Sequence, residues 1–537
     1  MAGRAKQHFF EAMGWLHTWV GIGLGSILFV VFWTGSLTVF DKEIDQWMKP
    51  ELRIHAPENV SFDTNILANL SNFKPKQGSE VWLGIPRERT PAVYLYFEDH
   101  EGNHHDIPLD PISGEKLDLT DSHAGTGFFF PFHFMLHLPG ALGYWLVGIA
   151  ALAMMMMVVS GVIIHRNIFI DFFTFRPNAN RRRSSLDLHN LTAVLGMPFH
   201  FLLPFTGILI FATVYFPWPV SVQYDGDLEG FSAAKYGTEH ISREALNKPG
   251  APVLAIDDYV ARAENIWQAE DGRETSGPDW VGIFNYADAN SYVSVERYFP
   301  SKRVAIGPDY VAFDPNTDEI IGQFRPLPIH SALNWLEGLH WIQFDHWVLR
   351  WLYFFAGLSG CVMIGSGFIF WMQSRIRKGQ KEAAKVRVIR AMSIASTTGI
   401  IVASGAFFVA NRLIPKDINL DAVHRHDLEI FVFFGVWILT LIHAVIRDKL
   451  AWREQCHAIA FTALCAVILN WVTTGDHLIT SAMQSMWQIA LMDITMLATA
   501  GLAMWASAQL QKKAEPQKAP KASLVTTETT AEVASGK

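Results

Sequence analysis

Residues 184–200 read SSLDLHNLTAVLGMPFH, a stretch in which two histidines lie in an otherwise largely apolar segment. Residues eleven positions apart in an α-helix lie within about 20° of each other around the axis and about 16 Å apart along it. His189 and His200 therefore share one face of the predicted helix. Ionisable side chains inside a membrane helix are energetically costly and mark a candidate functional site.

The composition of the whole chain agrees with a membrane location. Half of the 537 residues are hydrophobic. Eight apolar runs approach the length of a bilayer crossing, at about 14–40, 139–165, 187–216, 346–373, 391–412, 427–446, 456–474 and 485–508. The predicted fold class is therefore an α-helical polytopic membrane protein with about eight spans.

Basic residues set the predicted orientation, because loops rich in Lys and Arg stay in the cytoplasm. The basic clusters are Arg181 to Arg183 after the second span, Arg375 to Arg390 after the fourth, and Arg447, Lys449 and Arg453 after the sixth. Both termini are then cytoplasmic, and a bacterial inner membrane is the simplest setting. The segments 41–135 and 217–345 are expected in the periplasm.

The two outer segments resemble each other. Residues 92–117 and 291–324 each contain alternating strands, a polar turn and an Asp-Pro sequence, which together indicate β-hairpins. Each segment also contains a plausible helix, near 61–72 and 254–269. We therefore predict two periplasmic α+β domains, at 41–135 and 217–345. The rest of the chain is divided into 1–40 with the first span, 136–216 with the second and third spans, 346–380 with the fourth span, a four-span module at 381–510, and a disordered cytoplasmic tail at 511–537.

With these features the chain resembles the PepSY-associated transmembrane family over about residues 8–380. The matching pieces are Leu16-His17-Thr18-Trp19-Val20-Gly21, Leu136-His137, Leu186-Asp187-Leu188-His189, Gly338-Leu339-His340 and the two Asp-Pro hairpins, which resemble PepSY domains. The resemblance implies an inner-membrane reductase that uses haem to reduce ferric siderophores. It leaves spans five to eight without a role.

The histidines of the first four spans fall into two predicted levels. The cytoplasmic level contains His17, His165 and His189, the periplasmic level contains His133, His137, His340 and His346, and His200 lies near mid-depth. Imidazole is a natural axial ligand of haem iron, and two six-coordinate haems need four.

We predict that His17 and His189 bind one haem b and that His137 and His340 bind a second. His133, His200, His346 and His165 are further candidate ligands, and His165 also fits an interfacial residue at a helix end. The three cysteines form no C-x-x-C-H motif, so the haems are expected to be non-covalent.

The predicted function is electron transfer to a periplasmic ferric siderophore, which releases the iron upon reduction. The sequence offers no flavin or nicotinamide motif, so a quinol or a cytoplasmic reductase is the expected electron donor. Membrane lipid is an expected partner, and nucleic acid is not. The alternative is a non-redox membrane protein whose PepSY domains bind peptides or regulate a protease, or one that transports a siderophore.

Overall fold

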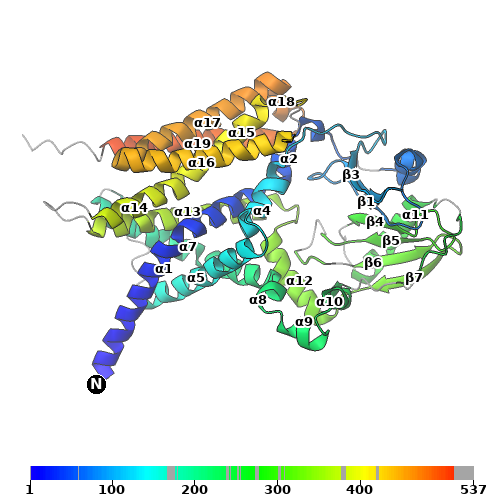
Figure 1. Cartoon of the computed structure of the whole chain (residues 1–537), viewed down its shortest axis with the longest axis horizontal. Coiled ribbons are helices and arrows are strands. Elements are labelled where there is room, and N and C mark those ends of the chain that lie inside the picture. The colour runs from blue at the N-terminus through cyan, green and yellow to red at the C-terminus, as the bar shows by residue number, and fades with distance from the viewer. Residues whose placement is uncertain are drawn as a thin grey trace, which may run out of the picture.

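A computed structural model describes residues 2–57, 60–165, 176–177, 179–236, 241, 243–250, 253, 255–271, 277–299, 304–307, 309–375, 383–418 and 422–512. Helices form an elongated bundle, and one β-sheet lies at its end, opposite the N-terminus (Figure 1). The predicted tail beyond residue 512 and parts of two basic loops lie outside the described residues.

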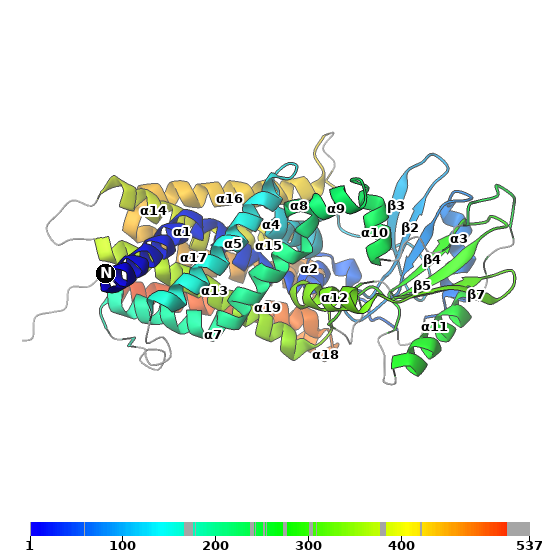
Figure 2. The ribbon, with the colours of Figure 1, turned by 90° about the horizontal axis from the view of Figure 1, so that it is seen from below.

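Four long helices form the first bundle: α1 (Ala2–Thr38), α5 (Leu142–Ile164), α7 (Arg181–Ile210) and α13 (Trp347–Arg375). Helix α1 packs on α5 and α13, and α7 packs on the same two helices, so α1 and α7 lie diagonally across the bundle. Figure 2 shows these helices from below, running between the N-terminal end and the sheet. This ring of helices encloses the candidate site.

Short helices close the sheet end of this bundle. They are α2 (Asp41–Met48), the π-helical η4 (Ala124–Phe129) with α4 (Phe130–Met135), α8 (Ala212–Tyr215), α9 (Trp218–Gln223), α10 (Leu228–Tyr236) and α12 (Pro328–Trp341). Helix α4 ends in two residues with left-handed backbone, Leu136 at φ 54° and His137 at φ 50°. The chain therefore turns sharply between α4 and α5.

The C-terminal part forms a second group of helices packed beside the first. It contains α14 (Ala384–Ile394), η5 (Ala395–Gly399), α15 (Ile400–Leu413), α16 (Arg425–Arg447), η6 (Asp448–Leu450), α17 (Ala451–Thr474), α18 (Leu478–Met483) and α19 (Trp487–Lys512). The two groups are joined by ring contacts, one stacked between Phe128 and Phe407 and the others edge-to-face, among Phe128, Phe129, Phe407 and Phe433. Sequence periodicity identified both groups, because each predicted span is a helix.

By length and apolar composition, seven helical stretches of the described chain qualify as membrane spans. One of them, Arg425–Thr474, contains both α16 and α17. Their separation falls at Asp448, whose backbone takes φ 51°. The chain is thus a multi-pass membrane protein by its helices, and the number of eight crossings stays a prediction.

The two outer segments share a single antiparallel sheet of seven strands, in the order β3-β2-β1-β4-β5-β6-β7. The strands are β1 (Val81–Gly84), β2 (Val93–Glu98), β3 (His104–Leu109), β4 (Trp280–Phe284), β5 (Tyr292–Glu296), β6 (Tyr310–Asp314) and β7 (Glu319–Phe324). Pairing of β1 with β4, in the register Val81 to Ile283, joins the halves. The two segments that we predicted as α+β domains therefore contribute their strands to one continuous sheet.

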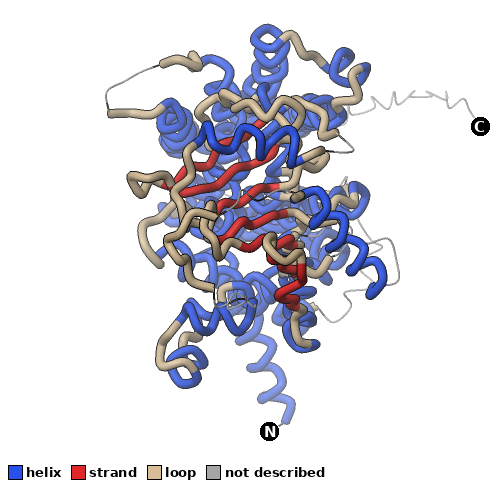
Figure 3. The backbone as a smooth tube through the Cα atoms, turned by 90° about the vertical axis from the view of Figure 1, so that its right-hand side faces the viewer, coloured by secondary structure: helices blue, strands red, loops and turns tan. Residues whose placement is uncertain are grey.

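Helices cover one face of this sheet. They are α11 (Ile256–Asp271) and the short series η2 (Phe62–Leu67), α3 (Ala68–Leu70) and η3 (Ser71–Phe73). Valine, leucine and phenylalanine side chains from both halves form one core beneath them. Figures 1 and 3 show these helices on the side of the sheet that faces away from the bundle. The opposite face of the sheet is therefore turned toward the bundle.

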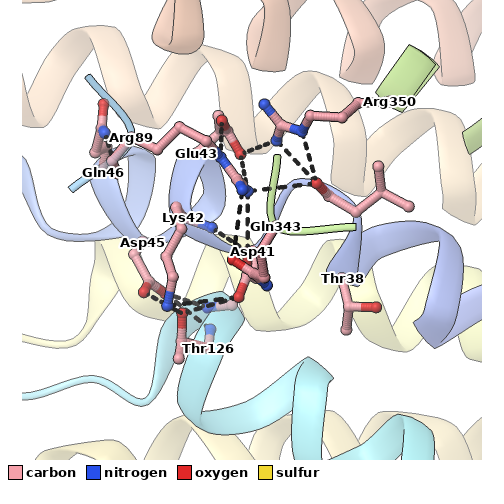
Figure 4. A network of polar contacts seen from close by, with 12 residues as sticks. Thr38, Asp41, Lys42, Glu43, Asp45, Gln46, Arg89, Thr126, Gln343 and Arg350 are labelled. Carbon is pink, nitrogen blue, oxygen red and sulfur yellow. Dashed lines mark hydrogen bonds and ion pairs between the residues drawn. The ribbon is translucent and has the colours of Figure 1, made fainter. Parts of the chain in front are cut away.

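A buried ionic network fixes the sheet end of the bundle (Figure 4). Glu43 of α2 accepts hydrogen bonds from Arg350 of α13 at 2.7 Å and from Nε of Arg89 at 3.0 Å. Arg89 also reaches Asp41 at 3.2 Å. The two guanidinium groups outweigh the effect of burial and lower the pKa of Glu43 to about 2. Glu43 is thus ionised at neutral pH and joins three separate segments.

Candidate functional site

Two cavities follow one another along the axis of the first bundle. The basic-side cavity, about 380 Å³, lies between α1, α5, α7 and α13 at the end that carries Arg375. The sheet-side cavity, about 310 Å³, is closed by α4 and α12. Leu28 lines both. Their volumes fall at the lower end of the roughly 300–1,000 Å³ typical of small-molecule sites, and both linings are mostly apolar.

His17 of α1 and His189 of α7 face each other across the basic-side cavity. Their ring centroids lie 6.2 Å apart with an angle of 87° between the planes. Nδ1 of His17 lies 3.0 Å from the carbonyl oxygen of Met157, and Nδ1 of His189 lies 2.8 Å from that of Met363. The structure therefore brings together the pair that the sequence predicted.

His133 of α4 and His340 of α12 form a second pair, in the sheet-side cavity. Their ring centroids lie 6.0 Å apart with an interplanar angle of 36°. Nδ1 of His133 lies 2.9 Å from the carbonyl oxygen of Val31, and Nδ1 of His340 lies 2.9 Å from that of Leu203. The two pairs are built in the same way.

The hydrogen bonds fix the tautomer of all four rings. A backbone carbonyl can only accept, so Nδ1 of each imidazole must carry the proton. Nε2 is then the unprotonated nitrogen, and among the described residues it makes no hydrogen bond in any of the four rings. Metal-binding histidines commonly donate their other N–H to a carbonyl in this manner.

The ring separations match the distance expected for two ligands of one iron. A metal–imidazole bond is about 2.0 Å long, and ring bonds near 1.35 Å place each nitrogen about 1.1 Å from the ring centre. Two axial imidazoles therefore have centroids about 6.2 Å apart, against 6.2 Å and 6.0 Å in the two pairs. No group of three His, Cys, Asp or Glu suited to a metal ion occurs in the described part of the chain.

His137, which we predicted to pair with His340, lies elsewhere. Its Nε2 is 2.9 Å from the carbonyl oxygen of Phe128, and its ring stacks on Phe128 at 4.9 Å. The left-handed residues that end α4 turn the chain after His133. The structure therefore gives the position opposite His340 to His133, which the sequence also offered as a candidate ligand.

His346 and His165 have different surroundings from the paired histidines. His346 is exposed, and its Nδ1 accepts a hydrogen bond of 3.3 Å from the backbone N–H of Leu349 in the first turn of α13. His165 lies at the rim of the basic-side cavity, with Nε2 2.8 Å from Asn190. His346 thus bonds within its own helix turn, whereas His165 lies at the rim of the cavity that His17 and His189 line.

His200 is buried and lines the basic-side cavity. It is 1 % exposed, its Nε2 lies 3.2 Å from the carbonyl oxygen of Ala356, and its ring contacts Phe32 at 5.5 Å. Its Nδ1 is a buried nitrogen that has no hydrogen-bond partner among the residues that the structure describes. Because Nε2 rather than Nδ1 is bonded to the backbone, His200 is oriented oppositely to the four paired histidines.

Histidines of the C-terminal helices are engaged elsewhere. His443 contacts Glu454 at 2.9 Å, His457 contacts Ser507 at 2.7 Å, and His477 caps α18. Helices α14 to α19 contribute none of the residues that line the two cavities. The candidate site therefore belongs to the first bundle.

Comparison with known proteins agrees with this division. The sequence profile of the PepSY-associated TM region matches residues 14–374. An uncharacterised protein of Pseudomonas aeruginosa is 23 % identical over 290 residues, which cover 52 % of this chain and 71 % of that protein. The matched region ends at the last residues of α13 and contains both histidine pairs.

Proposed function

We propose that this chain, which belongs to the PepSY-associated transmembrane family, is a two-haem protein that reduces a ferric siderophore at the sheet side of a bacterial inner membrane. The supporting observation is the pair of matched imidazole clamps, His17 with His189 and His133 with His340, at separations of 6.2 Å and 6.0 Å. The siderophore is proposed from the family resemblance.

The residues present fit b-type haem at both levels. Each cavity joins an apolar lining to a pair of imidazoles whose Nδ1 atoms are bonded to carbonyls and whose Nε2 atoms are the unprotonated nitrogens. The basic-side cavity also has a polar rim formed by Ser374, Arg375, Asn190 and His165, which suits the haem propionates. Tyr144, Tyr215 and Thr38 supply polar groups in the sheet-side cavity.

When bound, the haems would supply one-electron exchange at two levels of the bundle. His17 lies on α1 and His189 lies on α7. The carbonyl groups of Val31 and Leu203, which bind His133 and His340, follow fourteen residues later on the same two helices. At 1.5 Å per residue the two levels are therefore about 20 Å apart along the axis. Two sites in series can cover most of the thickness of a membrane core of about 30 Å.

The chain's own residues would orient the ligands and exclude water. The carbonyl hydrogen bonds hold each imidazole through Nδ1 and leave Nε2 to bind iron. At the sheet side, the face of the sheet turned toward the bundle presents partly buried aromatic side chains, among them Trp82, Tyr94, Tyr96 and Trp280. Such a face suits a bulky, partly aromatic ferric chelate.

The proposal is tested on protein purified in detergent from membranes of cells supplied with haem precursor. We expect a reduced-minus-oxidised spectrum of low-spin haem, two haems per chain, and reduction of an added ferric hydroxamate by the dithionite-reduced protein. Replacing His189 with Ala should remove about half of the haem. Absence of haem bands from well-folded protein would refute the proposal and favour a non-redox PepSY protein.

A further inference from the structure

The four paired histidines are held at one recurring structural element. Each Nδ1 donates to a helix carbonyl at position i, a Ser or Thr follows at i+3, and a Gly follows at i+4. The sets are Met157, Ser160 and Gly161 for His17; Met363, Ser366 and Gly367 for His189; Val31, Thr34 and Gly35 for His133; and Leu203, Thr206 and Gly207 for His340. We call each set a histidine seat.

The glycine of each seat makes room for the imidazole. A Cβ atom at Gly35 would lie 2.7 Å from Cε1 of His133, and one at Gly207 would lie 2.9 Å from Cε1 of His340. The corresponding distances are 3.1 Å from Gly367 to Nδ1 of His189 and 3.3 Å from Gly161 to Cε1 of His17. A side chain at i+4 would therefore press on the ring that reaches the carbonyl at i.

The hydroxyl of each seat also approaches the carbonyl that accepts from the imidazole. The distances are 3.2 Å for Ser160 to Met157, 3.0 Å for Ser366 to Met363, 3.3 Å for Thr34 to Val31 and 3.1 Å for Thr206 to Leu203. At three seats its shorter hydrogen bond goes to the carbonyl one residue earlier, at 2.8 Å for Thr34, 2.7 Å for Ser366 and 2.8 Å for Thr206. All four hydroxyl residues are buried, between 0 % and 4 % exposed. Because a hydroxyl carries one proton, its bond to the carbonyl that the imidazole uses is the longer branch of a shared hydrogen bond at these three seats. Through that branch the hydroxyl competes in part with the imidazole N–H for the lone pairs of one oxygen.

The seats follow the internal repeat of the chain. Helices α1 and α7 each carry a histidine and, fourteen and eighteen residues later, the carbonyl and the glycine of a sheet-side seat. Helices α5 and α13 carry the two basic-side seats. Each cavity is thus lined by equivalent elements from the two halves of the family region.

A Ser/Thr-Gly pair alone does not create a histidine seat. The C-terminal helices contain the pairs Thr398-Gly399 and Ser404-Gly405. Their glycines face the hydroxyls of Thr440 and Thr462 and not a histidine ring. Another such pair, Ser359-Gly360, lies beside His200, but there Nε2 meets the carbonyl and Gly360 faces Phe32. Among the described residues, the Nδ1 bond and a glycine beneath the same ring occur together at the four seats of the paired histidines.

We propose that the Ser/Thr and Gly of the four seats are positioning residues that set how strongly each imidazole binds and donates to haem iron; this rests on the proposed function. The glycine allows the ring to reach the carbonyl, and the hydroxyl weakens the hydrogen bond that the carbonyl accepts from Nδ1. A stronger bond at Nδ1 makes Nε2 a better electron donor and favours ferric iron. Removing the hydroxyl should therefore lower the reduction potential of that haem alone.

The experiment uses purified full-length protein and compares seat glycines with glycines that have free space beside them. Gly35→Ala is matched by Gly23→Ala in α1, and Gly367→Ala by Gly365→Ala in α13, because a Cβ at Gly23 or Gly365 meets nothing within 4 Å. Each seat variant should lose one of the two haems or convert it to a high-spin form. Both control variants should keep two low-spin haems.

A second variant covers the case in which the glycine variants fail to fold. Ser366→Ala leaves Gly367 and His189 in place, and redox titration should show a lower potential for the basic-side haem with an unchanged potential for the other. Wild-type protein without haem would refute the proposed function. If the wild-type protein holds two haems, the role of the seats can be refuted separately from the proposed function. Either of two results would refute it: wild-type potentials in Ser366→Ala, or wild-type haem content in folded seat variants.

Discussion

Replacing His133 by Ala should remove one of the two haems, whereas replacing His137 by Ala should remove neither. His133 faces His340 across the sheet-side cavity at 6.0 Å. His137 has its Nε2 bonded to the carbonyl oxygen of Phe128, so its loss should cost only about 1 kcal/mol of stability. The expected haem content is therefore about half of the wild-type value for His133→Ala and unchanged for His137→Ala, measured as pyridine haemochrome per mole of protein.

Electron paramagnetic resonance identifies which haem remains. Nearly perpendicular imidazole planes leave two iron d orbitals almost degenerate and give a strongly anisotropic low-spin signal, whereas planes closer to parallel give a rhombic signal. The angles of 87° for His17 with His189 and 36° for His133 with His340 thus predict one signal of each kind. His133→Ala should lose the rhombic signal and keep the anisotropic one.

Two results contradict this reasoning. If His137→Ala loses a haem while His133→Ala keeps both, the sheet-side pair is wrongly assigned. If both native haems give the same signal, the ring planes in the loaded protein differ from the angles of 87° and 36°. His346→Ala serves as the matched control, since His346 is exposed at the start of α13.

Two further predictions concern the outer part of the protein. Glu43→Gln should destabilise the folded protein by about 3 kcal/mol at pH 7, because the pKa of Glu43 falls from 4.5 to about 2 beside Arg89 and Arg350. This contribution to stability is present above pH 4.5 and is lost as the pH falls toward 2. Thermal melting should report the loss of stability, and an equal loss in the exposed Glu115→Gln control would contradict the prediction. Burial raises the pKa of Glu296 from 4.5 to about 7, so the folded protein holds this proton more tightly and its stability should decrease as the pH rises from 4.5 through 7. Glu296→Gln should remove this pH dependence and raise the free energy of unfolding by up to about 3 kcal/mol at pH 8. Limited proteolysis of the sheet should be faster at pH 8 than at pH 5 in the wild-type protein, and equal rates at the two pH values would show that the assignment is wrong.

Much of the bundle could be predicted because its signals are local. Each apolar run became a helix, and counting residues at 1.5 Å each placed His17 and His189 at matched depth. The seats also have a sequence signal that the predicted ligand pairs did not draw on: Thr34-Gly35, Ser160-Gly161, Thr206-Gly207 and Ser366-Gly367 each lie within a long apolar helix. A Ser/Thr-Gly pair acquires its role only when a histidine of another helix reaches it.

The sequence could not decide which histidine lies opposite His340, because the two candidates lie four residues apart on opposite sides of a turn. His133 lies within α4, while the left-handed backbone at Leu136 and His137 directs the second ring toward Phe128. Helical periodicity carries no information past such a turn. Only the packed structure could separate the two residues.

The sequence by itself determined the helices, the depth of the histidines and the repeat of the two outer segments, since these depend on hydrophobic runs, residue spacing and turn chemistry within one segment. The tertiary structure alone decided that β1 pairs with β4 to make one sheet, that His133 rather than His137 faces His340, and that His200 presents the opposite nitrogen. These features depend on contacts between residues far apart in the chain. Their free energies come from packing and hydrogen bonds across elements, which no local pattern encodes.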